Sequence, residues 1–99
     1  MMNIEQAKQL ALKKLEEIQK KTLVKLAIME EHTLPFKDGW VFFYQSEEFV
    51  ETKDPEKMVG GNAPILVDKQ NGNVLITGTS KDISYYIDTY TKMKTEWRS

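Results

Sequence analysis

The chain of 99 residues contains no cysteine, only one histidine and no long apolar run. Without cysteine it has no disulfide, thiolate nucleophile or cysteine-ligated metal site. No apolar segment approaches the ~18 residues that a membrane-spanning helix requires. The first ten residues also lack the basic-then-apolar pattern of a secretory signal. We therefore expect a cytoplasmic protein with no cofactor, no metal and no membrane segment.

Neither sign of charge dominates, since 14 basic residues against 15 acidic residues give a formal net charge of −1. Such a balance gives no general attraction to nucleic acid, and we expect no nucleic-acid partner. The charges are unevenly spread: residues 1–25 hold six lysines against three glutamates (+3), and residues 30–56 hold eight acids against two lysines (−6). This distribution is typical of a solvated surface, or of a basic helix and an acidic middle that meet different partners.

Helical periodicity marks both ends of the chain. Residues 3–20 form an amphipathic pattern, in which Asn3 and Gln6 are spaced for a capping box. Residues 81–97 repeat apolar side chains every three or four positions, with Ser80 as the expected N-cap. The spacing predicts one helix in each segment.

Alternating or continuous apolar runs between the helices predict four strands. They cover residues 23–31, 40–46, 65–67 and 74–77. Asn71-Gly72 predicts the turn of a hairpin that joins the last two. Asp54-Pro55 is a typical helix start, and Gly60 or Gly61 a typical stop, which predicts one or two helical turns within 47–61.

This order of elements predicts one domain, 1–99, of the α+β class. We expect two layers, with about four mainly antiparallel strands flanked by the N- and C-terminal helices. The strands carry apolar side chains on both faces, for example Val41 and Phe43 opposite Phe42. Either one helix crosses to the second face, or another chain covers it. We favour the second alternative, a homodimer or a partner surface.

Few residues suit catalysis. His32 stands alone, no serine lies in a nucleophile elbow, and the glycines of "GGN" precede a strand without the lysine of a phosphate loop. The densest acid cluster does not have the spacing of a calcium loop, which leaves a solvated connection or a partner-binding surface. Its members are Glu47, Glu48, Glu51, Asp54 and Glu56. We expect no catalytic residues and no enzyme.

The aromatic side chains gather on the 40–46 strand and on the last helix. Because that strand has no lysine or arginine, core packing accounts for Trp40 and Phe42 better than base stacking does. Tyr85 lies off the main helical stripe and Trp97 near the helix end. These two are therefore candidates for partner contact.

An ordered set of short motifs over residues 38–91 resembles the YrhB-like immunity proteins, the class called immunity protein 35. The set includes a "GWxFxY" strand, "ETxDP" and "GNAPILVD". Its structural residues here are Trp40, Phe42, Tyr44, Gly61, Asn62, Pro64, Asp68, Gly72 and Gly78. The resemblance implies a small bacterial protein that binds and neutralises a cognate toxin, and it implies no catalytic residues.

Two functions from different classes remain open at this stage. The first is a non-enzymatic protein similar to a polymorphic-toxin immunity protein, which masks its toxin with the acidic connection. The second is a chaperone-like homodimer that offers the apolar second sheet face to client segments. The breadth of partners separates the two, since the first has one tight partner and the second has many.

Overall fold

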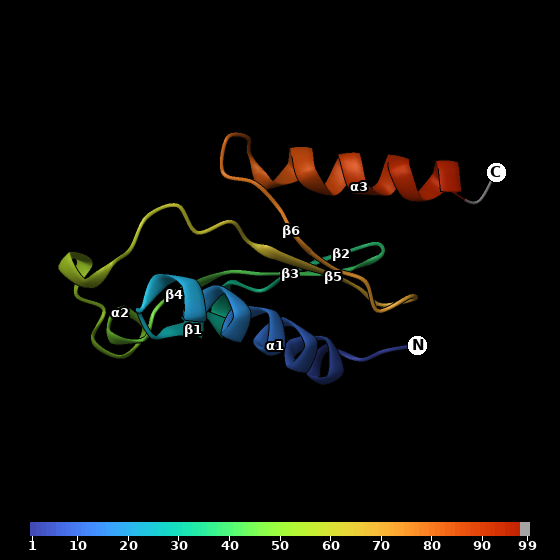
Figure 1. The fold of residues 1–99 in the computed structure, drawn as a ribbon. Helices are drawn as coiled ribbons and strands as arrows, with labels where there is room; N and C mark the ends of the chain where they lie inside the picture. Colours follow the sequence, from blue (N-terminus) through green and yellow to red (C-terminus); the bar gives the residue numbers. More distant parts are fainter. Residues whose placement is uncertain (98–99) are drawn as a thin grey trace.

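The computed structural model describes residues 1–97 and confirms the α+β class, with all strand pairs antiparallel. A four-stranded sheet has the order β2-β3-β5-β6, and a two-stranded sheet pairs β1 with β4 (Figure 1). The strands are β1 (Leu26–Ile28), β2 (Leu34–Phe36), β3 (Gly39–Phe42), β4 (Tyr44–Ser46), β5 (Ile65–Asp68) and β6 (Val74–Ile76). No helix among residues 1–97 is long and apolar enough to cross a membrane.

The first helix, α1 (Ile4–Thr22), confirms the predicted capping box. Asn3 Oδ1 accepts from the Gln6 N–H at 2.9 Å, and Gln6 Oε1 accepts from the Asn3 N–H at 2.9 Å. The helix buries Ala7, Ala11 and Leu15. It ends at Leu23, whose φ of 61° is the left-handed conformation common at helix C-termini.

The sequence missed one strand and joined two others. Leu34–Phe36 forms β2, which is not among the four predicted strands. It contains Pro35 and is an end strand of its sheet, where a missing N–H is tolerated. The predicted strand 40–46 is interrupted at Phe43, so that β3 and β4 belong to different sheets. The predicted strand 23–31 is shorter, because residues 30–32 form a 3-10 turn, η1 (Glu30–His32).

The connection between β4 and β5 contains two short helical segments. A helix, α2 (Glu47–Thr52), is followed by a 3-10 turn, η2 (Pro55–Lys57), at the predicted Asp54-Pro55 start. Asp54 caps η2 by accepting from the Glu56 N–H at 3.0 Å. The following hairpin matches its prediction, and Gly72 has the positive φ of 74° that its turn requires.

The last helix, α3 (Ile83–Trp97), starts two residues later than predicted. The residue before it is Asp82, and Ser80, which was expected to be the N-cap, instead forms a hydrogen bond of 3.1 Å with Tyr86 Oη. Gly78 leaves room for the same ring, since a Cβ there would lie 2.4 Å from Tyr86 Oη.

The two long helices lie on opposite faces of the four-stranded sheet, with α3 above it and α1 below it in Figure 1. The sheet is therefore the middle of three layers, and the expected two-layer arrangement is wrong in this respect. The helix α3 crosses to the second face. The second face of the sheet, whose expected exposure suggested a homodimer, is covered by α3.

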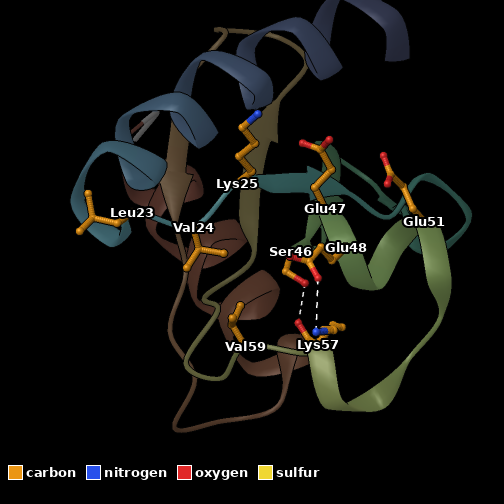
Figure 2. Close-up of a pocket in the computed structure, with 9 residues that line it drawn as sticks. All are labelled: Leu23, Val24, Lys25, Ser46, Glu47, Glu48, Glu51, Lys57 and Val59. Atoms are coloured by element: carbon orange, nitrogen blue, oxygen red, sulfur yellow. Dashed lines mark hydrogen bonds and ion pairs between the residues drawn. The ribbon is translucent and has the colours of Figure 1, made fainter.

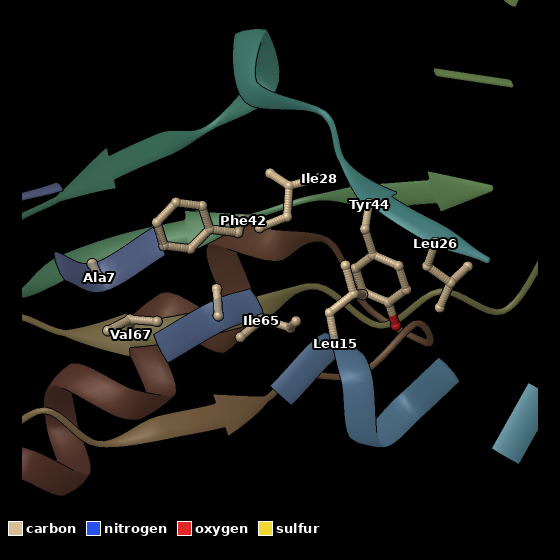
Figure 3. Close-up of a cluster of buried hydrophobic side chains, with 9 residues drawn as sticks. Ala7, Leu15, Leu26, Ile28, Phe42, Tyr44, Ile65 and Val67 are labelled. Carbon is tan, nitrogen blue, oxygen red and sulfur yellow. The ribbon is translucent and has the colours of Figure 1, made fainter. Parts of the chain in front are cut away.

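Two apolar clusters follow from this arrangement. The larger lies between the sheets and α1, where Phe42 and Ile65 pack among aliphatic side chains (Figure 3). The smaller joins Val41 and Leu66 to Tyr90 of α3, with Ile83 and Ile87 beside them. Trp40, Phe42 and Tyr44 thus share one side, and Val41 and Phe43 the other, as the alternation predicted.

Buried polar contacts fasten α3 to the sheet. Lys94 Nζ lies 2.7 Å from Asp68 Oδ2 and 3.4 Å from Asp38 Oδ1, and Tyr90 Oη donates to Asp68 Oδ2 at 2.5 Å. Asp68 is fully buried at the end of β5, and Lys94 is 5% exposed. We call these four residues the α3 latch. A buried charge requires such partners, which explains why α3 lies where it does.

The latch sets the protonation of its members. Burial raises the pKa of the Asp68 carboxyl, but hydrogen bonds from Lys94, Tyr90 and two backbone N–H groups outweigh it and leave the pKa lowered. Burial, together with the hydrogen bond to Asp68, raises the pKa of Tyr90 to about 12. At neutral pH the pair is therefore carboxylate and neutral phenol.

Candidate partner-binding surface

A groove of about 420 Å³ opens between the end of α1 and α2 (Figure 2). Apolar side chains, Leu23, Val24 and Val59, lie on one side of it. Charged side chains, Glu47, Glu48 and Glu51 of α2 with Lys57, occupy the other side, and Lys25 lies between the two sides. We call this the α1–α2 groove. It brings together residues from three separate parts of the chain.

Hydrogen bonds from β4 fix the shape of the groove. Ser46 caps α2 by accepting from the Phe49 N–H at 3.1 Å, and its hydroxyl donates to the Lys57 carbonyl at 2.5 Å. Gln45 exchanges two hydrogen bonds of 2.8 Å with the backbone of Val59. Because these polar groups are buried and paired, α2 and the segment after η2 are held against the sheet.

Three of the five predicted acidic residues line this groove. Glu47 and Glu51 stand four residues apart, which places them on one face of α2, and Figure 2 shows both carboxylates directed to the same side. Glu48 points instead toward Lys57, whose Nζ lies 3.6 Å from its carboxylate. Within residues 1–97, Glu47 and Glu51 form no ion pair.

The other predicted contact residues lie elsewhere. Asp54 and Glu56 belong to η2 and its cap and do not line the groove. Tyr85 of α3 is 51% exposed and packs edge-on against Tyr86, with ring centroids 5.3 Å apart. The Trp97 side chain lies outside the described structure. His32 is exposed in η1, with its Nε2 4.0 Å from Glu31.

Sequence reasoning missed Leu23, the most exposed large apolar residue of the groove. Its side chain is 96% exposed, and its backbone is left-handed, a conformation that favours glycine or asparagine. The sequence offered two signals: a helix pattern predicted to end at residue 20, and an apolar residue soon after it, where a glycine cap is usual. Neither shows that the side chain faces solvent.

Three residues of the motif set, Gly61, Asn62 and Pro64, shape the segment between η2 and β5. Gly61 has a φ of +73°, and Asn62 donates to the Val59 carbonyl at 3.0 Å. The Pro64 carbonyl accepts from both the N–H and the hydroxyl of Thr77, at 2.9 and 2.8 Å. The stretch 58–68 therefore turns the chain from η2 into β5. Separately, residues 1–97 contain no group of three or more histidine, aspartate or glutamate side chains placed to hold a metal ion.

Comparison with known proteins decides the family. The model of the family described as immunity protein 35 matches residues 5–92. The chain belongs to the immunity protein 35 family.

A relative of this immunity protein 35 member is the uncharacterized protein YrhB of Escherichia coli (strain K12). The two are 38% identical over 55 residues, which cover 56% of this chain and 58% of the relative. The match thus spans little more than half of that relative's length. No solved structure matches the chain.

Proposed function

We propose that this chain is a non-enzymatic immunity protein that binds a cognate protein toxin through the α1–α2 groove. Membership of the immunity protein 35 family supports the toxin-neutralising role. The observation that carries the choice of surface is Leu23, an apolar side chain 96% exposed on one side of a groove whose opposite side carries three carboxylates. Apolar anchors ringed by polar groups are the usual centres of protein interfaces.

The charges of the groove favour a partner with a basic face. Glu47 and Glu51 form no ion pair in the described chain, and both carboxylates point to one side of α2, where they meet an approaching partner. Nucleases have basic surfaces because they hold phosphate backbones. A rigid acidic surface that covers such a face prevents substrate from entering. We therefore propose a toxin with a basic active-site groove.

The chaperone-like alternative has lost its basis. It required an exposed apolar second sheet face, and α3 lies over that face. We do not propose it as a second function.

The first test is neutralisation of the protein encoded beside this chain's gene, by coexpression and a growth assay. Glu47→Lys/Glu51→Lys should abolish protection and slow association, most strongly at low salt, because screening weakens exposed charges. The matched control, Glu16→Lys/Asp88→Lys, makes the same change of net charge at exposed sites outside the groove. If the groove variant protects as well as the control, the surface is wrong; if the wild-type chain does not protect, the proposed function fails for that partner.

A further inference from the structure

The two end strands of the four-stranded sheet differ in how their outer edges are protected. The edge at β2 contains Pro35, which has no N–H to offer, and Lys37 follows the strand. The edge at β6 is Val74-Leu75-Ile76, without proline or charge. Natural sheets block an edge that must stay unpaired with such residues. The β6 edge lacks this protection.

The strand register shows which backbone groups face outward from β6. Thr77 N–H donates to the Pro64 carbonyl and Asp68 N–H to the Asn73 carbonyl, each at 2.9 Å, while Leu66 and Leu75 are register partners. In an antiparallel pair the intervening residues point their N–H and C=O groups away from the neighbouring strand. Those of Val74 and Ile76 therefore face outward. They match the donors and acceptors of one added strand.

Grooves of different chemistry flank this edge on the two faces of the sheet. On the α3 side, a groove of about 220 Å³ is lined mainly by apolar side chains, including Leu75, Met93 and Tyr86. On the α1 side, a groove of about 480 Å³ surrounds Ile76 and Ile18. Its charged lining is Lys14, Lys20, Lys21 and Glu17, a net of +2 (three lysines minus one glutamate).

We propose that the free edge of β6 binds an extended segment of a partner polypeptide in which acidic and apolar side chains alternate. Successive side chains of a strand point to opposite faces. The apolar set then enters the groove beside Met93, and the acidic set faces the lysines of α1. Main-chain hydrogen bonds to Val74 and Ile76 supply affinity, and the two grooves supply selectivity. This surface is separate from the α1–α2 groove and does not depend on toxin binding.

Charge complementarity favours this occupant over a second copy of the chain. A β6 strand from another copy brings only apolar side chains, and its own α1 brings a second lysine-lined groove toward the first. The like charges of the two grooves oppose that pairing. An acidic strand meets the lysines with opposite charge instead.

The test uses a fluorescently labelled short peptide in which glutamate alternates with valine or leucine, titrated against the full chain. We expect saturable binding that weakens with salt, and little binding of the same peptide with lysine in place of glutamate. Lys21→Glu should weaken binding about three- to tenfold, the range expected from reversing an exposed charge pair. The control is Lys13→Glu, which changes an exposed lysine of the same helix that does not line the groove and should leave binding unchanged.

A second pair of variants tests the backbone contact. Ile76→Pro and Ile76→Ala both remove the isoleucine side chain, but only proline removes the outward N–H. We expect Ile76→Pro to bind at least about tenfold more weakly than Ile76→Ala. Because Ile76→Pro could fail to fold, circular dichroism checks it, and slowed hydrogen exchange at the wild-type Ile76 amide reports the same contact. Equal binding by both folded variants, equal binding of the lysine peptide, no saturable binding, or self-association through this edge would each overturn the proposal.

Discussion

Leu23→Gly should make the protein more stable and a weaker binder. Leu23 holds a left-handed backbone at the C-terminus of α1, where its N–H donates to the Gln19 carbonyl at 3.2 Å. That conformation costs an L-residue about 1–2 kcal/mol, whereas glycine adopts it without strain. Glycine loses about 0.5–1 kcal/mol more than other residues in conformational entropy on folding. Since the side chain is 96% exposed, little apolar burial is lost.

The net expectation is a gain of roughly 0.5–1 kcal/mol in the free energy of unfolding. For a domain of this size, that raises Tm by about 2–8 °C. Urea titration and thermal melts followed by circular dichroism measure both quantities. A lower stability than wild type would refute the reasoning, because it would mean that the leucine side chain packs against the protein.

Two matched variants separate the backbone effect from the interface. Lys53→Gly relieves the same left-handed conformation, φ 63°, at the end of α2, but Lys53 does not line the groove. This variant should be stabilised slightly less than Leu23→Gly, because it loses the exposed Lys53–Glu31 ion pair of 3.3 Å, and it should bind the toxin normally. Leu23→Ala keeps the strain and removes the anchor, so its stability should stay near wild type. Both Leu23 variants should bind about 5- to 30-fold more weakly, as expected for a truncated interface anchor. Unchanged affinity would remove Leu23 from the proposed surface.

Two further predictions concern the α3 latch. Lys94→Met leaves Asp68 and Asp38 buried without their cation. Urea titration should show a free energy of unfolding lower by about 3–5 kcal/mol. A loss below about 1 kcal/mol would show that the latch does not hold α3. Alkaline unfolding tests Tyr90, whose pKa is raised to about 12 in the folded state from a usual value of 10.0. The folded state holds this proton more tightly, so the contribution is complete below pH 10 and disappears as pH rises toward 12. The two-unit difference corresponds to about 2–3 kcal/mol, and the stability difference between wild type and Tyr90→Phe should shrink by that amount across this interval. A stability difference between wild type and Tyr90→Phe that stays constant over this pH interval would contradict the raised pKa of Tyr90.

Local sequence signals predicted the local structure of this chain well. The capping box at Asn3, the Gly72 turn and the alternation of Phe42 and Tyr44 against Val41 each depend on neighbouring residues, and each is present. The strand at Pro35 was missed because proline is excluded from central strands but tolerated at an edge. Whether a strand lies at the edge depends on pairing with residues far along the chain.

The candidate site shows the same division. The acidic composition of 47–56 was visible in the sequence, but its separation into groove residues and the cap of η2 was not. That separation depends on the hydrogen bonds of Gln45 and Ser46, which join segments more than ten residues apart. Leu23 entered the site only because the end of α1 lies beside α2.

By itself, the sequence determined the two long helices, the β5–β6 hairpin, the faces of the strands and the family motifs, because these are properties of residues close together along the chain. Only the tertiary structure decided that α3 covers the second sheet face. Periodicity says that a helix has an apolar stripe, but not against which face the stripe packs. In this chain the α3 latch fixes the face, because Lys94 of α3 pairs with Asp38, just before β3, and with Asp68, at the end of β5. A buried charge is stable only where its partners are, and the sequence does not show which distant residues those are.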